Sequence, residues 1–446
     1  MSAKQKLSYP KISVLGLQHM FAMFGATILV PLITGLDVRI TLLAMGVGTL
    51  IFHLFAKGKV PVMLGSSFAF MVGIQAIAHP DTGLFAEANM TQAERLAYAT
   101  GAIMVAGCMY LVFALIAKLA GPEKFMKFLP AVVTGPTVVL IGLILAPFAI
   151  NQSRSNFWLA GITLLLVVIA SIWGKGFAKV VPILIGLVGA YVVALAVHSL
   201  GGTNPDGTAI LNFEGLSGAG FVSLPDFMLP RFGLIPILVM IPFSFATIAE
   251  HVADMVILSG VAKTDFTKEP GLTRTLVGDG LASIFAGFIG GPSSTTYSEN
   301  VGLVAMTNEP DPRPLRVGAL YAIILAFIPV AGIIVQTVPD AIIGGASFML
   351  YGMIAAVGMK IIKQVDLDVR KNLVIVSVML VIGLGMRFAD PIAIPISDGE
   401  VDIRRVGVAL AVVVGVILNF ILPNKESDEA AASEDVADEA VAETAE

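Results

Sequence analysis

The sequence GFIGGPSSTTYSENVGLVAM, residues 287–306, is apolar at both ends and polar in its centre. Two glycines and a proline precede the run STTYS, whose residues favour extended backbone more than helix. Extended backbone at membrane depth persists only where other protein segments or a watery cavity cover it. We therefore expect a transmembrane span that is interrupted here, with Glu299 at the interruption.

A second segment has the same character. Pro61 is followed by GSSFAF, residues 65–70, again small and polar residues within an apolar stretch. Paired short segments broken by Gly or Pro, at corresponding places in the two halves of a transporter, point to its substrate site near the middle of the bilayer. We place the predicted site between these two segments.

The composition indicates a polytopic membrane protein. Of the 446 residues, 57% are hydrophobic and 13% are charged, with a mean hydropathy of +0.90, whereas a soluble protein has about 25% charged residues. The single cysteine, Cys108, cannot form an internal disulfide. The N-terminal residues lead into a full-length span without a small-residue cleavage site, so we expect no removable signal peptide.

Windows of about 20 apolar residues predict fourteen spans. They lie near residues 12–34, 40–56, 61–78, 98–120, 126–150, 157–174, 178–199, 232–256, 270–289, 292–307, 315–337, 341–361, 371–389 and 404–422. The third and the tenth are the two broken segments.

The charges are distributed unevenly over this map. Twenty of the 27 Lys and Arg residues fall in loops on the N-terminal side. The seven on the other side are Arg39, Arg95, Arg154, Arg231, Arg387, Arg404 and Arg405. Because cytoplasmic loops carry the excess of Lys and Arg, both termini are predicted to be cytoplasmic. Nine of the 32 acids lie in residues 424–446, an Ala/Glu/Asp tail that we expect to be disordered.

The spans also predict an internal repeat. Seven precede the polar loop at residues 200–230 and seven follow it. An odd number in each half makes the halves cross the membrane in opposite directions, which is a seven-plus-seven inverted repeat. The predicted fold is an all-α polytopic membrane protein with short β-strands interrupting spans three and ten.

Glu250 and Glu299 are candidate site residues because a carboxylate at the bilayer centre costs about 3 kcal/mol. Glu250 lies more than two turns inside the eighth span, and Asp254 follows it on the same helix face. Pairing of either acid with Lys263 or Arg274 near the cytoplasmic end is the alternative interpretation. Two carboxylates facing one small cavity cannot easily both be ionised, so one of the two glutamates is expected to carry a proton.

Other interior polar residues have weaker assignments. His19 is either a core residue or a ligand, and His53 favours a structural role. Asp279 is expected to be a packing or helix-end partner, and Tyr351 is either a wall residue or a hydroxyl partner. The chain has no GxxxxGK[ST] loop, no Cys/His cluster or HExxH motif and no GxSxG motif. Direct drive by ATP, a metal site and an intramembrane hydrolase are therefore not expected.

These motifs resemble those of the nucleobase–ascorbate transporter family, and most closely those of its bacterial uracil permeases, over nearly all of residues 8–423. The family signature is Gln, Glu or Pro, then Asn-x-Gly, four residues, and Thr followed by a basic residue or Gly. Here it reads ENVGLVAMTN, residues 299–308, and departs only at Asn308. The Gln18-His19 pair, the GSSFAF segment and the AEH of the eighth span also match.

The resemblance implies a division of the spans into two domains. A core domain would comprise spans one to four and eight to eleven, residues 12–120 and 232–337. A gate domain would comprise the other six spans, residues 126–199 and 341–422. Members of the family are typically dimers, so a homodimer is expected.

The resemblance also implies a substrate site. Glu250 would accept hydrogen bonds from the ring N–H groups of a base, and Glu299 would be the second anchor and the protonation switch. Backbone N–H groups at Phe68 and Ser298 would meet the carbonyl oxygens of the base, with Ser67 in the same segment. The supporting and proton-coupling residues that are implied are His19, Asp254, Tyr297 and Tyr351. Some relatives carry His at the position of Asp254, so its role stays open.

By the same resemblance, the first residue of the signature indicates the substrate. Gln implies oxidised purines, Pro implies ascorbate, and Glu, as at Glu299, implies uracil. The expected function is import of uracil with a proton across the cytoplasmic (inner) membrane, with no cofactor, no enzymatic reaction and no nucleic-acid partner. The alternatives are a xanthine or urate permease of the same fold, an anion transporter of the same architecture and a membrane-embedded enzyme.

Overall fold

The computed structural model describes residues 7–86, 88–121, 130–213, 216, 220–390, 392–396 and 399–423. The acidic tail at residues 424–446, predicted to be disordered, lies outside the described residues.

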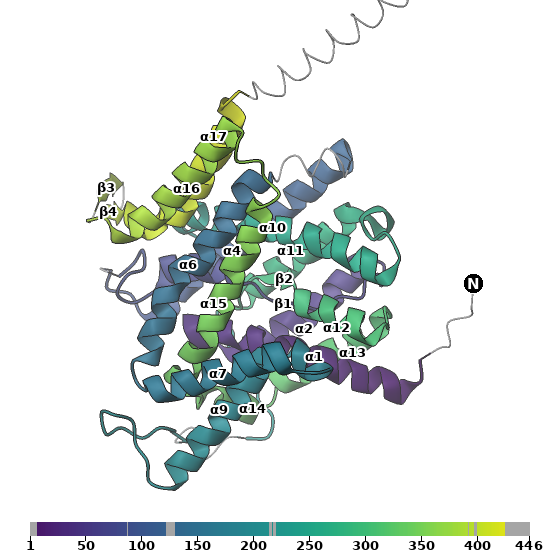
Figure 1. Cartoon of the computed structure of the whole chain (residues 1–446), viewed down its shortest axis with the longest axis vertical. Coiled ribbons are helices and arrows are strands. Elements are labelled where there is room, and N and C mark those ends of the chain that lie inside the picture. The colour runs from purple at the N-terminus through teal and green to yellow at the C-terminus, as the bar shows by residue number, and fades with distance from the viewer. Residues whose placement is uncertain are drawn as a thin grey trace, which may run out of the picture.

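The described chain is mostly helical (Figure 1). Its first half contains α1 (Tyr9–Thr34), α2 (Val38–Phe55), β1 (Leu64–Ser66), α3 (Phe68–Ala78), α4 (Gln92–Ala120), α6 (Ala131–Ser153), α7 (Phe157–Trp173), α8 (Phe177–Val180) and α9 (Pro182–Ser199). Its second half contains α10 (Leu234–Ala262), α11 (Leu272–Phe288), β2 (Ser294–Thr296), α12 (Ser298–Thr307), α13 (Pro312–Ala326), α14 (Pro329–Gln336), α15 (Asp340–Ile362), α16 (Arg370–Phe388), β3 (Ala393–Ile396), β4 (Gly399–Asp402) and α17 (Gly407–Ile421).

The lengths of these helices confirm a multi-pass membrane protein. Nine helices of the described chain are long and apolar enough to cross a membrane, and the bent pair of α13 and α14 makes a tenth. The span predicted near residues 315–337 is not one straight helix, because α13 and α14 meet at 83°. Pro329 is the first residue of α14. Its ring is suited to a helix start and cannot donate the backbone hydrogen bond that would continue α13.

The helices form two groups that pack mainly within themselves. The first group joins α11 to α2 and α4, α13 to α1 and α2, and α10 to α3 and α4. The second joins α15 to α6, α7 and α9, and α16 to α17 and α6. In Figure 1, α6, α15, α16 and α17 lie to the left of α11, α12 and α13.

Small residues allow the closest helix contacts in both groups. A Cβ atom at Gly16 in α1 would lie 2.8 Å from the carbonyl oxygen of Pro314 in α13. In the second group, a Cβ atom at Gly142 in α6 would lie 2.6 Å from the carbonyl oxygen of Tyr351 in α15. Such close backbone approach is how helices associate in membranes, where the surrounding lipid removes the hydrophobic drive.

Candidate substrate site

The two predicted broken segments lie side by side at the centre of the structure. β1 and β2 pair antiparallel, with Gly65 opposite Thr295. The N–H of Ser67 extends the pairing by donating to the carbonyl oxygen of Ser293 at 2.9 Å. All six strand residues are buried. Protein therefore covers this extended backbone on every side, as membrane depth requires.

Each strand is followed at once by a short helix. α3 begins at Phe68 and α12 begins at Ser298, and neither N-cap residue, Ser67 or Tyr297, makes a side-chain cap hydrogen bond. The first N–H groups of a helix have no partner within it. Both helix starts therefore offer N–H donors close to the paired strands. The side chain of Ser298 is not among those that the structure describes.

An aromatic pair joins the two helix starts. The rings of Phe68 and Tyr297 stack with centroids 6.2 Å apart and planes at 12°. The hydroxyl of Tyr297 donates to the carbonyl oxygen of Ser66 at 2.6 Å, which fixes the ring against β1. Gly65 makes room for this arrangement, because a Cβ atom there would lie 2.5 Å from the Tyr297 ring.

α10 carries two acids toward this crossing. Glu250 lies in the middle of α10, and its side chain remains accessible. It lies close enough to Asp254, Asp279 and Glu299 for their charges to interact. Asp254 is 2% exposed, and its Oδ2 atom accepts a hydrogen bond of 2.8 Å from the hydroxyl of Thr296 in β2. The structure thus places Asp254 against the strand pair.

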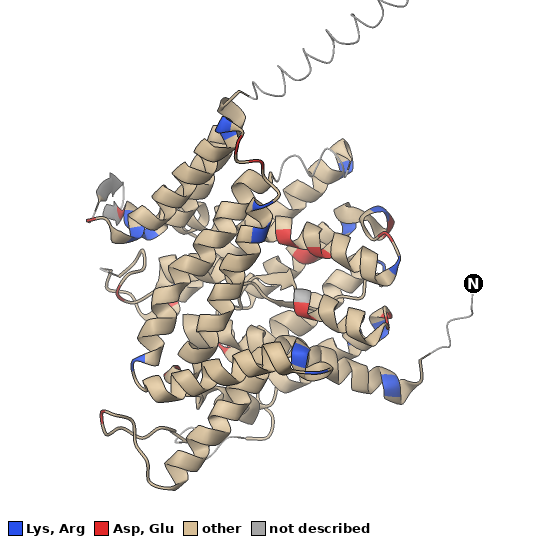
Figure 2. Ribbon diagram, viewed as in Figure 1, with Lys and Arg blue, Asp and Glu red and all other residues tan. Residues whose placement is uncertain are grey.

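Glu299 opens onto a cavity. It lies in the first turn of α12 and is partly exposed. The cavity has a volume of about 530 Å³ and is lined by α1, α8, α9, α12 and α15, including Lys179, Met306 and Met353. Tyr351 is buried in α15, two residues before Met353. We call this the inner cavity, because loops predicted to be cytoplasmic lie at its Lys179 end. Figure 2 shows acidic residues on α10 and α12 in the middle of the protein, with Lys and Arg mainly at helix ends.

The two interior histidines singled out above bind polar partners. Nδ1 of His19 is 2.9 Å from Oδ1 of Asn300, the residue after Glu299, and the His19 side chain is buried. His19 therefore links α1 to the turn of α12 that carries Glu299. Nε2 of His53 is 2.8 Å from the carbonyl oxygen of Val62, which fits its expected structural role.

Sequence reasoning missed one buried pair beside the site. Nδ1 of His251 lies 3.1 Å from Oδ2 of Asp279, and both side chains are fully buried between α10 and α11. Asp279 was expected only as a packing or helix-end partner, whereas it faces the histidine next to Glu250. The sequence offers no signal for this pairing beyond the position of His251. Among the described residues, no group of three or more His, Cys, Asp or Glu is arranged to hold a metal ion.

Two solved structures share the fold of this chain. The fold matches the transmembrane domain of the cyanobacterium bicarbonate transporter BicA, with a TM-score of 0.59 and 16% identity over 91% of this chain and 96% of that chain. It also matches the murine Slc26a9 anion transporter in the inward-facing state, with a TM-score of 0.64 and 12% identity over 94% of this chain and 69% of that one. At such identities the likeness shows a shared transporter fold.

Sequence comparison gives the family. A model described as "Permease family" matches residues 10–392. The uracil permease of Bacillus subtilis (strain 168) is 36% identical over 442 residues, 94% of each chain. The putative pyrimidine permease RutG of Escherichia coli (strain K12) is 36% identical over 389 residues, 85% of this chain and 84% of the relative. The chain belongs to this permease family, that of the nucleobase–ascorbate transporters, and is a transporter rather than an enzyme.

Proposed function

We propose that this protein imports uracil together with a proton across the cytoplasmic membrane. The observation that carries the proposal is that Glu250 lies on α10, which contacts β2 and α12, within range of the charge of Glu299 in the first turn of α12. Relatives that match along more than nine-tenths of both chains bear the name uracil permease. Glu299 is the first residue of the family signature, and Glu at that position favours uracil over purines as the substrate.

Uracil is a small flat ring with alternating N–H and C=O groups, and the candidate site offers a partner for each. The carboxylate of Glu250 has two acceptor oxygens for ring N–H donors. The N–H groups at the starts of α3 and α12 are donors for the ring carbonyl oxygens. The ring of Phe68, held parallel to Tyr297, provides an aromatic face against which a planar base can stack.

Glu299 is our candidate for the proton switch. Its side chain reaches the inner cavity while its helix start lies at the strand pair, so it connects the proposed base site to a route out of the membrane. A protonated carboxyl both donates and accepts, whereas a carboxylate only accepts. Loss of the proton toward the inner cavity would remove a donor from the base and release it. Asp254 and His19 are the supporting candidates.

Movement of two domains would expose the site to each side in turn. We assign the group that contains α1, α2, α4, α10, α11 and α13 to the core domain and the group that contains α6, α7, α9, α15, α16 and α17 to the gate domain. In an inverted repeat of fourteen spans, α6, α7 and α9 would correspond to α15, α16 and α17. The helix contacts support this correspondence. The packing of α7 on α9 matches that of α16 on α17, and the packing of α15 on α7 matches that of α6 on α16. We expect both termini in the cytoplasm and a homodimer in the bilayer.

Uptake of radiolabelled uracil by cells that express the protein tests this proposal. An imposed inward proton gradient should drive accumulation, and unlabelled uracil should compete while xanthine and sulfate should not. Sulfate tests the alternative of an anion transporter, because the two solved structures that share this fold are those of a bicarbonate transporter and an anion transporter. Two interior glutamates would repel an anion. Competition by xanthine would assign a purine substrate, and competition by sulfate alone would refute a nucleobase site.

A further inference from the structure

The two sides of the candidate site are not equally open. A second, smaller cavity of about 200 Å³ lies between α3 and α10 on one side and α6, α16 and α17 on the other. Its lining includes Val72, Phe243, Arg387 and Arg405 but neither Glu250 nor Glu299. Phe243 lies seven residues, or about two helical turns, before Glu250. This outer cavity therefore ends short of the site, whereas the inner cavity reaches Glu299.

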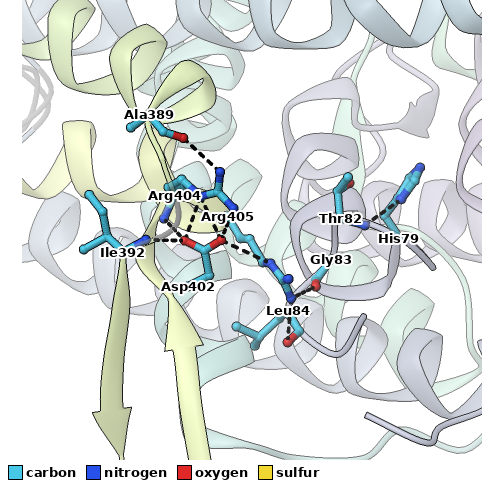
Figure 3. Close-up of polar contacts among 9 residues, drawn as sticks. All are labelled: His79, Thr82, Gly83, Leu84, Ala389, Ile392, Asp402, Arg404 and Arg405. Atoms are coloured by element: carbon cyan, nitrogen blue, oxygen red, sulfur yellow. Dashed lines mark hydrogen bonds and ion pairs between the residues drawn. The ribbon is translucent and has the colours of Figure 1, made fainter. Parts of the chain in front are cut away.

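Arg405 lines the outer cavity and connects its two sides. It lies in the 3₁₀ turn Ile403–Val406 that precedes α17. Its Nη1 atom donates to the carbonyl oxygens of Gly83 at 2.6 Å and of Leu84 at 3.5 Å, in the loop after α3 (Figure 3). More than 300 residues of sequence separate these partners. The contact joins the two helix groups at the side opposite the inner cavity.

Asp402, at the end of β4, holds Arg405 in position. One carboxylate oxygen lies 3.8 Å from Nε of Arg405, and the same carboxylate binds the guanidinium of Arg404 through both of its oxygens. Arg404 also donates to the carbonyl oxygen of Ala389, where α16 ends. Charge-assisted and forked contacts of this kind are geometrically specific, so Asp402 and Arg404 fix the segment that carries Arg405 against the end of α16.

Hydrogen bonds and a ring contact also hold the loop after α3, which accepts the hydrogen bonds of Arg405. Nδ1 of His79 accepts from the backbone N–H groups of Asp81 and Thr82, both at 3.2 Å, and Figure 3 shows the Thr82 contact. The N–H of Leu84 donates to the carbonyl oxygen of Ala76 at 2.7 Å. The His79 ring also meets the edge of Phe148 in α6, with centroids 5.6 Å apart. The loop thus presents its carbonyl oxygens from a fixed position.

We propose that Arg405 is the outer gating residue of this transporter: its contact with Gly83 and Leu84 keeps the outer path closed while the inner cavity is open. This inference builds on the proposed alternating access. To open the outer path, α17 and α3 must separate, and the Arg405 contact must break first. Removal of the Arg405 guanidinium should therefore shift the population toward outward-open molecules.

Cysteine labelling measures this shift without any substrate. The native Cys108 is replaced by Ser, and a single cysteine is introduced either at Val72 in the outer cavity or at Ala22 in the inner cavity. A membrane-impermeant thiosulfonate is applied to whole cells. We expect Arg405→Gln to speed labelling of the outer cysteine by about tenfold, the effect of losing one charge-assisted hydrogen bond on a two-state equilibrium. In inside-out vesicles, labelling of the inner cysteine should slow.

Arg387→Gln is the matched control. Arg387 lines the same cavity and carries the same charge. Within the described residues it makes no hydrogen bond or ion pair, and it acts on the loop only through its charge, at His79. Arg405→Lys retains the charge and should raise the labelling rate of the outer cysteine by less. It replaces Arg405→Gln in the experiment if that variant does not reach the membrane. Unchanged outer labelling in the Arg405 variants, or an equal rise in Arg387→Gln, overturns the proposal. Because no uracil is used, either result holds whatever the substrate proves to be.

Discussion

The hydroxyl of Thr296 donates a 2.8 Å hydrogen bond to Oδ2 of Asp254, and both side chains are buried. This bond ties the end of β2 to the helix that carries Glu250, one turn away. Thr296→Val keeps the shape of the side chain but leaves one Asp254 oxygen without this donor. We expect it to destabilise the protein by about 1–3 kcal/mol and to weaken uracil binding. Thermal unfolding and calorimetry of the purified variant measure both effects.

Thr296→Ser is the control for that change, because it retains the hydroxyl and should keep the affinity. If Thr296→Val binds uracil and unfolds like the parent protein, the bond does not position the site.

Gly65 is expected to tolerate no side chain. A Cβ atom there would meet the Tyr297 ring at 2.5 Å, and the ring is held by its bond to Ser66. Gly65→Ala should cost about 1–3 kcal/mol and reduce uracil affinity by displacing the Phe68–Tyr297 pair. Gly161→Ala in α7 is the control, since a Cβ atom there meets nothing within 4 Å, and it should be neutral or slightly stabilising. Equal behaviour of the two variants would show that the ring can move freely.

Glu250→Gln should abolish uracil binding, because an amide cannot offer two acceptor oxygens to ring N–H donors. Calorimetry on the purified variant tests this expectation. Glu309→Gln is a matched control at the protein surface, where Glu309 pairs with Lys11, and it should bind as the parent does. Near-normal affinity of Glu250→Gln would remove Glu250 from the site.

The loop after α3 should loosen in acid. Burial lowers the pKa of His79 below its usual value of 6.5, with a contribution from Arg387 and an opposing one from Asp81. The folded loop thus favours the neutral ring, whose Nδ1 accepts two N–H groups. Its contribution to stability is present above pH 6.5 and is lost as the pH falls through the lowered pKa.

The unfolding temperature of the parent protein should consequently drop more between neutral pH and about pH 5 than that of His79→Gln, which cannot titrate at this position. A parallel pH dependence of the two proteins would contradict the role assigned to His79.

The sequence was most informative where a residue conflicts with its surroundings. Glu250, Glu299 and the polar segments around them are costly in a membrane, so their placement at the strand pair could be expected. The apolar runs likewise predicted the helices, because spanning a bilayer demands about 20 such residues. The break before Pro329 was missed, since proline is also common inside the helices of this chain, as at Pro31 and Pro136.

Contacts between distant segments could not be predicted in the same way. Neither the His251–Asp279 pair nor the Arg405 contact with Gly83 leaves a periodic or local pattern. Each depends on how helices from different parts of the chain pack together. The charge and hydropathy of neighbouring residues in the sequence do not indicate that packing.

The central claim is that Glu299 carries the coupled proton, and Glu299→Gln tests it most directly. The amide mimics a permanently neutral carboxyl, with an acceptor oxygen and N–H donors in nearly the same volume. The measurement is uracil affinity against pH for both proteins, together with uptake under an imposed proton gradient. We predict that the variant still binds uracil, that its affinity no longer changes with pH, and that it exchanges uracil but does not concentrate it. A variant that keeps the parental pH profile and still concentrates uracil would contradict the account and make Asp254 or His19 the better candidate.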